Sequence, residues 1–541
     1  MICLLKSKRV FIAAAAAMGI LLVGSVWLHA QRTDRRGIAA LLPSGAIFYL
    51  EAKDFHQILT QWNSSEERRR WLASDDASVL SQSRLLQRLM QAQTQFATVA
   101  GLPIEMSLVS ELAGGESAFA FYDFSTLHFV YLTRMNGARL DQNSLWKSRS
   151  SYQARDAAGI PFYVKTQVDG RESYSVAFAA HDGWLVVATE PGLMARTLAL
   201  LANQPVTSLS GEMWYEDTVK QIREQGDLRL VYNMTALRKS PQFRTNWIQR
   251  NKSELASFDS GSADLFERSS GFEERRVLLR STPPEAKTDT TALTQVLSHI
   301  PRGASLYRAW ATPNRAVVRS VLQQVIVSES AAGPDLNKNA PEVSTDAPIA
   351  GSDNDLETRI DEAPFQRSSD NNIEAVTDAV MAMGPRALLH SQVTQVTGDR
   401  VFVLPQSAIA LVCSKPDGAA LDKVLHGSIG IAKTGNLDPL RMSAENGIVE
   451  LSRIASHTPL TAPAVLSGEA YAASYEHAAE WPRYRHLFGV LDHKNGDAPA
   501  FFSDNIRSLG DSLYRIRRVS VIVQLEGQVT RDTVRYEFLA K

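Results

Sequence analysis

The sequence has little that would support metal or redox chemistry. It contains only two cysteines, Cys3 and Cys413, in 541 residues, and its eleven histidines are scattered. No His-Glu-x-x-His or Cys-x-x-Cys spacing occurs. A phosphate-binding loop and a dinucleotide fingerprint are also missing, and the only glycine doublet, Gly114-Gly115, is typical of a tight turn rather than an anion-binding nest. We therefore expect no metal and no cofactor.

The sequence also lacks a charge excess and a recognisable nucleophile. Its 57 basic and 58 acidic residues give a net charge of −1, so we expect no nucleic-acid partner. No Gly-x-Ser-x-Gly elbow is present. The nearest approach to a triad is Ser117 beside Glu116, with Asp123 and His128 close in sequence. The alternating pattern of polar and apolar residues predicts that these side chains lie on a sheet without a catalytic role. The pair Glu273-Glu274 is interpreted as solvated charge.

One long hydrophobic run is present and no second one. It extends for 19 residues, from Val10 to Leu28, and at about 1.5 Å per residue it matches the roughly 30 Å core of a bilayer. Cleavage after Ala30 is the alternative, but it would place the large Leu28 three residues before the cut. Trp27 suits a membrane interface. We interpret residues 10–28 as an uncleaved transmembrane signal-anchor.

Basic residues flank this run on both sides. Lys6, Lys8 and Arg9 precede it, and Arg32, Arg35 and Arg36 follow it. A short N-terminal tail with a long following body usually leaves the tail, residues 1–9, in the cytoplasm. The chain is then a single-pass protein of the cytoplasmic membrane with an extracytoplasmic, periplasmic body. Arg32, Arg35 and Arg36, together with Trp27, would meet the lipid headgroups.

The two cysteines would then lie on opposite sides of the membrane, so they cannot form an intramolecular disulfide. Cys413 ends the apolar run Ser407–Cys413 and is expected to be a buried small hydrophobic residue. A body without disulfides that lies outside the cytoplasm is typical of a bacterial envelope protein stabilised by its core.

The body shows signs of internal duplication. Leu42–Tyr49 (LPSGAIFY) returns 258 residues later as Ile300–Tyr307 (IPRGASLY), and Thr133–Asp141 returns as Ser414–Asp422. Each copy ends in two strand-like runs around a turn. We therefore predict two related domains, at residues 38–281 and 291–541.

The local pattern is mixed. Runs rich in β-branched and aromatic residues predict strands, bounded by Gly, Asp and Asn turn signals such as the hairpin dipeptide Asp182-Gly183. Expected strands are 46–51, 117–122, 127–133, 161–166, 173–179 and 184–189, and expected helices are 83–100, 140–148, 193–202, 213–224 and 315–326. Adjacent hairpins with interposed helices predict an α+β fold with largely antiparallel sheets.

Residues 328–372 differ in character. They are rich in Ser, Asp, Asn and Pro and almost lack aromatic residues. Such a segment buries too little apolar area to offset its chain entropy, so it is predicted to be a disordered insertion within the second repeat.

The motif Leu41–Tyr49 (LLPSGAIFY) after an anchor helix, with Leu112–Ala120 and the strand–turn–strand Val176–Thr189, resembles a family of uncharacterised bacterial membrane-anchored proteins, classed only as a domain of unknown function. The resemblance covers mainly residues 38–281. It implies an envelope location and a repeated α+β body, and it transfers no catalytic residues.

A second basic feature is Arg68-Arg69-Arg70, flanked by Trp62 and Trp71. It is interpreted either as a membrane-facing or partner-facing patch, or as a solvated helix end whose tryptophans pack inward.

The sequence as a whole favours a non-enzymatic, membrane-anchored envelope protein that acts in interaction or scaffolding. An envelope hydrolase with an unrecognised site and a lipid- or ligand-binding module are the alternatives. No motif in the sequence identifies the protein or lipid partner.

Overall fold

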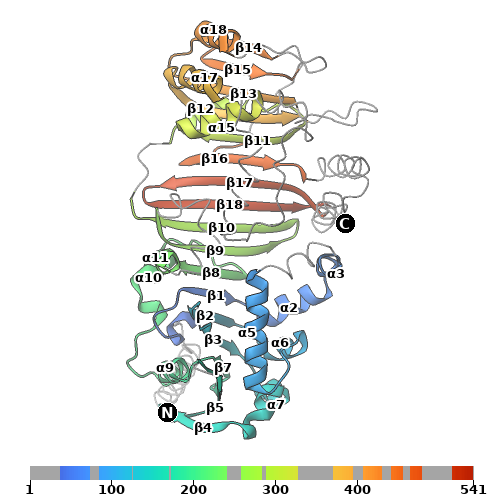
Figure 1. Cartoon of the computed structure of the whole chain (residues 1–541), viewed down its shortest axis with the longest axis vertical. Helices are drawn as coiled ribbons and strands as arrows, with labels where there is room; N and C mark the ends of the chain where they lie inside the picture. The colour runs from blue at the N-terminus through green and yellow to red at the C-terminus, as the bar shows by residue number, and fades with distance from the viewer. Residues whose placement is uncertain are drawn as a thin grey trace, which may run out of the picture. The chain divides into compact units, whose positions relative to one another are not determined.

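The structure is a computed structural model of the whole chain. It describes residues 37–73, 84–124, 126–169, 172–239, 257–282, 288–326, 370–393, 406–428, 440–454, 463–477 and 515–539. The predicted tail and anchor, residues 1–28, lie outside these ranges. Among the described residues, no helix combines the length and the apolar character needed to cross a bilayer. The chain divides into two compact units, the first formed by residues 1–57 and 92–219 and the second by residues 58–91 and 220–541 (Figure 1).

The first unit is built on an antiparallel sheet with the strand order β1-β2-β3-β7-β6-β5-β4. The strands are β1 (Phe48–Ala52), β2 (Ser117–Asp123), β3 (His128–Arg134), β4 (Gln153–Ala157), β5 (Ile160–Asp169), β6 (Glu172–His181) and β7 (Trp184–Ala188).

The second unit has an antiparallel sheet with the order β8-β9-β10-β18-β17-β16-β11-β12-β13-β15-β14 (Figure 1). Its strands are β8 (Leu228–Asn233), β9 (Phe258–Arg268), β10 (Gly271–Arg280), β11 (Ala304–Ala311), β12 (Pro385–Val393), β13 (Gln406–Cys413), β14 (Arg441–Glu445), β15 (Ile448–Ser452), β16 (Glu469–Tyr475), β17 (Ile516–Glu526) and β18 (Val529–Phe538).

Helices pack on both faces of the first sheet and of the β11–β15 part of the second sheet. Those of the N-terminal part are η1 (Ile38–Leu41), α2 (Phe55–Ser64), α3 (Glu66–Leu72), α5 (Arg84–Ala100), α6 (Met106–Leu112), α7 (Gly137–Gln142), α8 (Ser144–Lys147), η2 (Ser148–Ser151), α9 (Pro191–Leu201), η3 (Leu209–Gly211) and α10 (Met213–Lys220). The others are α11 (Met234–Lys239), α14 (Thr290–Leu297), α15 (Arg315–Ile326), α17 (Asp370–Ala382) and α18 (Gly418–Ser428).

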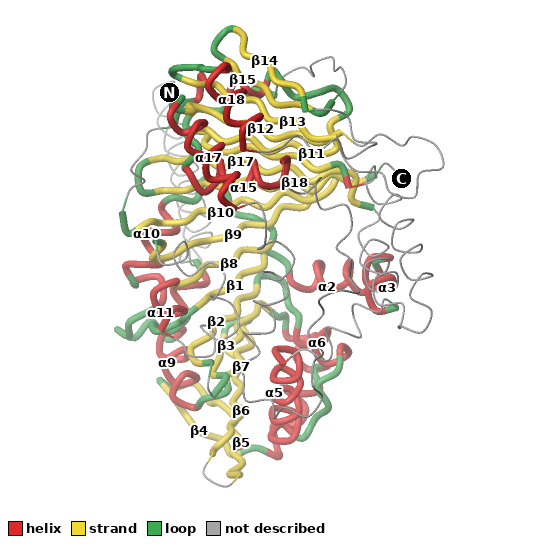
Figure 2. Tube along the Cα trace, turned by 45° about the horizontal axis from the view of Figure 1, so that its top comes forward, coloured by secondary structure: helices red, strands yellow, loops and turns green. Residues whose placement is uncertain are grey.

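Alternation along the strands explains this layering. In β12, Leu388 faces the core formed with α15, α17 and α18, whereas Ala387 and Leu389 face the core formed with α14. In the first unit, α6 and α9 lie on opposite sides of the strands (Figure 2). The sheet of the first unit and the β11–β15 part of the second sheet are therefore the middle layers of three-layer arrangements.

The predicted α+β class with a largely antiparallel sheet is confirmed. The helix predicted at 315–326 matches α15, and Asp182 and Gly183 have the positive φ angles, 47° and 78°, of a hairpin turn. The edge strand β4 was not predicted, because its residues (QARDA) are polar and largely exposed.

Two boundaries are corrected. The predicted helix 140–148 is several short helices, α7, α8 and the start of η2, because Asn143 ends α7 and caps α8 through its side-chain oxygen. The predicted insertion 328–372 ends too late, because α17 begins at Asp370. The rest of that segment, residues 328–369, lies outside the described ranges.

The two compact units do not follow the boundary between the predicted repeats. Residues 220–281, the end of the first predicted repeat, belong to the second unit. The reason is the ladder between β10 and β18, because it joins strands of both predicted repeats in one sheet.

Similar features nevertheless recur in the two halves of the chain. The order β1-β2-β3-β7-β6 is repeated as β11-β12-β13-β15-β14. The hairpin β9–β10 pairs Arg268 with Gly271, and the hairpin β17–β18 pairs Glu526 with Val529, each residue 258 positions later. This is also the separation between the two copies of the motif at Leu42.

The glycine doublet Gly114-Gly115 serves close packing before β2. The N–H of Gly114 donates to Thr133 Oγ1 at 3.0 Å, and the N–H of Gly115 donates to the carbonyl oxygen of Arg134 at 3.0 Å. A Cβ on Gly114 would lie 2.1 Å from that same carbonyl oxygen. Since both N–H groups are used within the protein, the doublet is not an anion-binding nest.

We predict that Gly114→Ala lowers the free energy of unfolding by about 1–3 kcal/mol, because the added methyl group overlaps backbone atoms. Gly115→Ala is the matched control, since its Cβ would meet nothing within 4 Å, and its effect should stay below about 0.5 kcal/mol. Urea unfolding of the full chain, followed by tryptophan fluorescence, measures both. Equal effects of the two substitutions would contradict this explanation.

Candidate functional site

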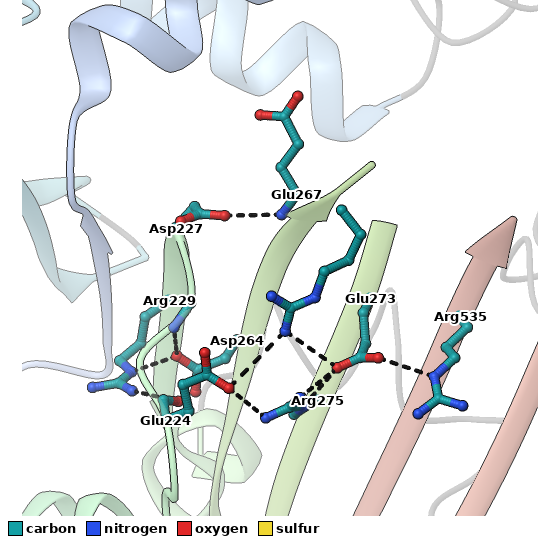
Figure 3. Close-up of polar contacts among 10 residues, drawn as sticks. Glu224, Asp227, Arg229, Asp264, Glu267, Glu273, Arg275 and Arg535 are labelled. Atoms are coloured by element: carbon teal, nitrogen blue, oxygen red, sulfur yellow. Dashed lines mark hydrogen bonds and ion pairs between the residues drawn. The ribbon is translucent and has the colours of Figure 1, made fainter. Parts of the chain in front are cut away.

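A concentrated group of charged side chains lies where β10 meets β18. The two strands pair from Gly271 opposite Glu537 to Leu279 opposite Val529, and Arg275 faces Thr533, the residue 258 positions later. One face of β8, β9, β10 and β18 carries the network drawn in Figure 3. We call this group the joint network; its charged members are Glu224, Asp227, Arg229, Asp264, Arg268, Glu273, Arg275 and Arg535, and Glu267 contributes only its backbone N–H, which donates to Asp227.

A buried ion pair forms the β8–β9 end of the joint network. Asp264 accepts from Arg229 Nε at 2.8 Å and from the backbone N–H of Gly226 at 2.8 Å. The side chains of Arg229 and Asp264 are 9% and 2% exposed. Alternation directs both to the same face, because Arg229 and Asp264 are direct partners in the β8–β9 ladder.

Glu273 on β10 is the centre of the joint network. Its Oε1 accepts from Arg275 Nε at 2.7 Å, and its Oε2 accepts from Arg535 Nε of β18 at 2.9 Å (Figure 3). Arg268 adds a longer contact of 3.5 Å. The guanidinium carbons of Arg268 and Arg275 lie 4.5 and 4.7 Å from the ring centroid of Phe266, so the two cations pack against a buried aromatic ring.

Electrostatics keeps Glu273 ionised. Burial raises the pKa of its carboxyl group, but hydrogen bonds from Arg535 and Arg275 and the charges of both arginines outweigh it, so the pKa lies below the ordinary 4.5. The joint network is therefore a charge-balanced contact at neutral pH.

These contacts show that the joint network connects neighbouring strands of the sheet. Both oxygens of Glu273 accept hydrogen bonds from protein donors, and the carboxylate of Asp264 is buried against Arg229. Neither group is placed to act on a bound molecule. The interpretation of Glu273-Glu274 as solvated charge was wrong, since Glu274 also accepts from Arg276, at 2.6 and 2.8 Å. Sequence spacing gave no sign of the arginines on neighbouring strands.

The serine constellation is not an active site. Ser117 is 3% exposed, and its hydroxyl is bonded to Thr133 Oγ1 at 2.6 Å and to the carbonyl oxygen of Gly115 at 3.0 Å. His128 is paired with Asp123 in the β2–β3 ladder, at the opposite end of the strands from Ser117. This arrangement fits the prediction that these side chains lie on the sheet without a catalytic role.

Cys413 and the predicted membrane-interface residues are the other positions that the sequence singled out. Cys413 is buried, as predicted, and burial raises the pKa of its thiol to about 11, so it is not a reactive thiolate. Trp27, Arg32, Arg35 and Arg36, predicted to lie at the membrane interface, fall outside the described residues.

The predicted patch Arg68-Arg69-Arg70 lies on α3. Ser65 caps this helix by accepting from the N–H of Arg68 at 3.1 Å, and Glu66 pairs with Arg70 at 2.7 Å one turn later. Trp71 is half-buried, whereas Trp62 is 44% exposed. The alternative in which both tryptophans pack inward is therefore wrong for Trp62.

A buried histidine was missed by the sequence analysis. His390 on β12 is fully buried, with its Nδ1 2.9 Å from Arg308 Nη2 of β11. Burial, together with the charge of Arg308, lowers the pKa of His390 to about 3. The imidazole is neutral at physiological pH, so it is not a proton-transfer group there. Its signal in the sequence, a histidine inside the apolar run of a strand, is common to many core positions.

Comparison with known proteins gives no family. No family model matches the chain, and no curated protein matches it. Solved structures of TP0453 are similar: crystal form I is 13% identical and covers 48% of this chain and 83% of that chain, with a TM-score of 0.26. Crystal form III is 12% identical, covers 49% and 86%, and has a TM-score of 0.25. Likeness at this level supports neither a common fold nor a common function. Among the described residues, no three His, Cys, Asp or Glu side chains are grouped to hold a metal ion.

We predict that Asp264→Asn lowers the free energy of unfolding by about 3–5 kcal/mol, because it leaves the buried Arg229 without its counter-charge. Asp259→Asn on the same strand is the control. Its side chain is 52% exposed and 3.7 Å from Arg238, and its loss should cost less than about 1 kcal/mol. Denaturant titration of the full chain compares them, and similar midpoints would refute the role assigned to Asp264.

Glu273 should also make the free energy of unfolding of the second unit depend on pH in the acidic range. Because the folded pKa of Glu273 is depressed below 4.5, its stabilisation is fully present above about pH 4.5 and is lost as the pH falls through the folded pKa. Glu273→Gln should therefore be less stable than the native chain by about 1–3 kcal/mol at pH 7, with the difference shrinking below pH 4.

The measurement is the difference between the two chains in urea unfolding across this pH range. Glu116 and Glu469, whose pKa values burial raises, act in the opposite direction, but both chains contain them, so they cancel in the comparison. A difference that does not change with pH would show that the charge of Glu273 is not what stabilises the joint.

Proposed function

We propose that this chain is a membrane-anchored, extracytoplasmic envelope protein that acts in interaction or scaffolding rather than catalysis. The observation that carries the proposal is the joint network: the buried carboxylates Asp264 and Glu273 are engaged by arginines and backbone donors that connect neighbouring strands. These charged groups connect the strands of the sheet to one another.

The membrane part of the proposal rests on the sequence. The 19-residue run Val10–Leu28 has the length of a bilayer core and basic residues on both sides. We propose that it stays attached, with residues 1–9 in the cytoplasm and the body outside. Arg32, Arg35 and Arg36 would then contact lipid phosphates next to the anchor.

The body is proposed to consist of two domains related by duplication, at residues 38–281 and 291–541. Supporting features are the common strand order and the 258-residue shift between the two terminal hairpins. A third is helix capping: Asn136 Oδ1 accepts from the N–H of Arg139, and Asp417 Oδ1 accepts from the N–H of Ala420, both at 2.9 Å. These two caps occupy matching positions in the second repeated motif, and each starts the helix that follows β3 or β13.

We predict that a reporter fused after Lys541 is active outside the cytoplasm and sediments with the membrane fraction. A fusion to alkaline phosphatase, which is active only outside the cytoplasm, should be active. A fusion to a fluorescent protein that folds only in the cytoplasm should not be fluorescent. The control is the same fusion to a chain lacking residues 1–36, which should lose both export and membrane association. Phosphatase activity that is absent from the full fusion would overturn the placement.

A chemical test separates scaffolding from hydrolysis. The intact protein, purified in detergent, should not be labelled by a fluorophosphonate probe that reacts with activated serines, because Ser117 is buried and bonded within the sheet. Stoichiometric labelling would favour the envelope hydrolase instead.

A further inference from the structure

The second unit exposes apolar and basic side chains together at one end of its sheet. We call this the α3 patch; it comprises Trp62, Leu72, Phe272, Leu539, Arg68, Arg69, Arg70, Arg515 and Arg517. Its four apolar side chains are 44%, 58%, 38% and 41% exposed, in the order named. Such a concentration of large exposed apolar residues in one place usually marks an interaction surface.

Ion-pair, aromatic and backbone contacts connect the parts of the α3 patch. Glu67 on α3 forms an ion pair with Arg515, directly before β17. The guanidinium of Arg515 lies 5.3 Å from the ring centroid of Phe538, and that ring packs edge-on against Phe272 at 5.5 Å. The N–H of Leu539 donates to the carbonyl oxygen of Arg515 at 2.7 Å. The helix α3 and the ends of β10, β17 and β18 therefore form one continuous surface.

The α3 patch carries a positive charge. Seven arginines, the five of the patch together with Arg268 and Arg518, share this end of the sheet with Glu66, Glu67, Glu267, Glu476 and Glu537, which leaves a net charge of +2. Glu66 and Glu67 are engaged by Arg70 and Arg515, and among the described residues no acidic side chain pairs with Arg68 or Arg69. Arg69 and Arg517 are exposed, so positive charge stands next to exposed Trp62 and Leu72.

We propose that the α3 patch rests against the headgroup region of an anionic membrane. The combination fits that occupant in three respects: arginines complement lipid phosphates, a tryptophan prefers the interface, and an aliphatic side chain can enter the acyl boundary. This inference rests on the proposed function, since a chain tethered at its N-terminus keeps its body near a membrane. It adds a second contact, through residues more than thirty positions beyond the anchor.

The test uses the full chain reconstituted into vesicles. Hydrogen–deuterium exchange is compared in phosphatidylcholine vesicles and in vesicles containing about one third phosphatidylglycerol. Peptides covering residues 55–73 and 515–539 should exchange about tenfold more slowly on the anionic vesicles. Peptides covering β14 and β15 serve as the internal reference and should not change. About 0.5 M salt should remove the protection, because it screens the exposed arginines.

Charge reversal provides the matched variants. Arg68→Glu with Arg69→Glu should abolish the protection, whereas Lys415→Glu with Lys423→Glu, an equal charge change at exposed positions on and beside α18, should leave it intact. Equal protection on both kinds of vesicle, or protection that survives the reversal at Arg68 and Arg69, overturns the proposal. Protection seen only on native membranes, and not on protein-free anionic vesicles, assigns the patch to a protein partner and also overturns it.

Failure of the anchor is recognised separately by vesicle flotation. A chain that does not float with either kind of vesicle contradicts the proposed membrane tether, whereas a chain that floats with both but shows no protection contradicts only the α3 patch.

Discussion

The antiparallel pairing of β10 with β18 is the contact on which the second unit depends. It joins the meander β8–β9–β10 to the meander β16–β17–β18 in one sheet, and it pairs residues that are 250 or more positions apart in the chain. Strand pairing alone would leave two edges of similar shape with several possible registers. The ion pair between Glu273 and Arg535 favours the observed register, because the two residues are direct partners in the β10–β18 ladder. The contacts of Arg268 and Arg275 with Phe266 lie within the β9–β10 hairpin and stabilise that hairpin instead.

The same joint explains why the compact units differ from the predicted repeats. A duplicated domain would normally end where its sequence copy ends, near residue 281. Here the hairpin β9–β10, at the end of the first predicted repeat, continues the sheet formed by later strands, so residues 220–281 belong to the second unit. The hairpins β9–β10 and β17–β18 are 258 residues apart in the chain and meet edge to edge, and Arg275 faces Thr533, the residue 258 positions later. This is the arrangement expected when two copies of one strand edge pair about a local two-fold axis.

Charge has two different uses in this molecule. Within the joint network, the buried carboxylates of Asp264 and Glu273 are paired with Arg229 and Arg535 of neighbouring strands, which connects those strands through side chains as well as backbone. On the α3 patch, arginines remain at the surface beside exposed apolar side chains. The first use stabilises the body, and the second suits a body that has to contact a membrane or a partner. The proposed role in scaffolding rests on this division.

The sequence by itself determined the local features, which depend on nearest neighbours: the strands and their alternation, the helix at Arg315–Ile326, the Asp182-Gly183 hairpin, the buried Cys413 and the antiparallel α+β class. Its repeated motifs also pointed to duplication. Only the tertiary structure decided which strand lies beside which, and hence that Glu273 is buried against Arg535 instead of solvated. The physical reason is that an ion pair across a sheet depends on the register between distant strands. That register is set by the packing of the whole core, and no spacing along the chain records it.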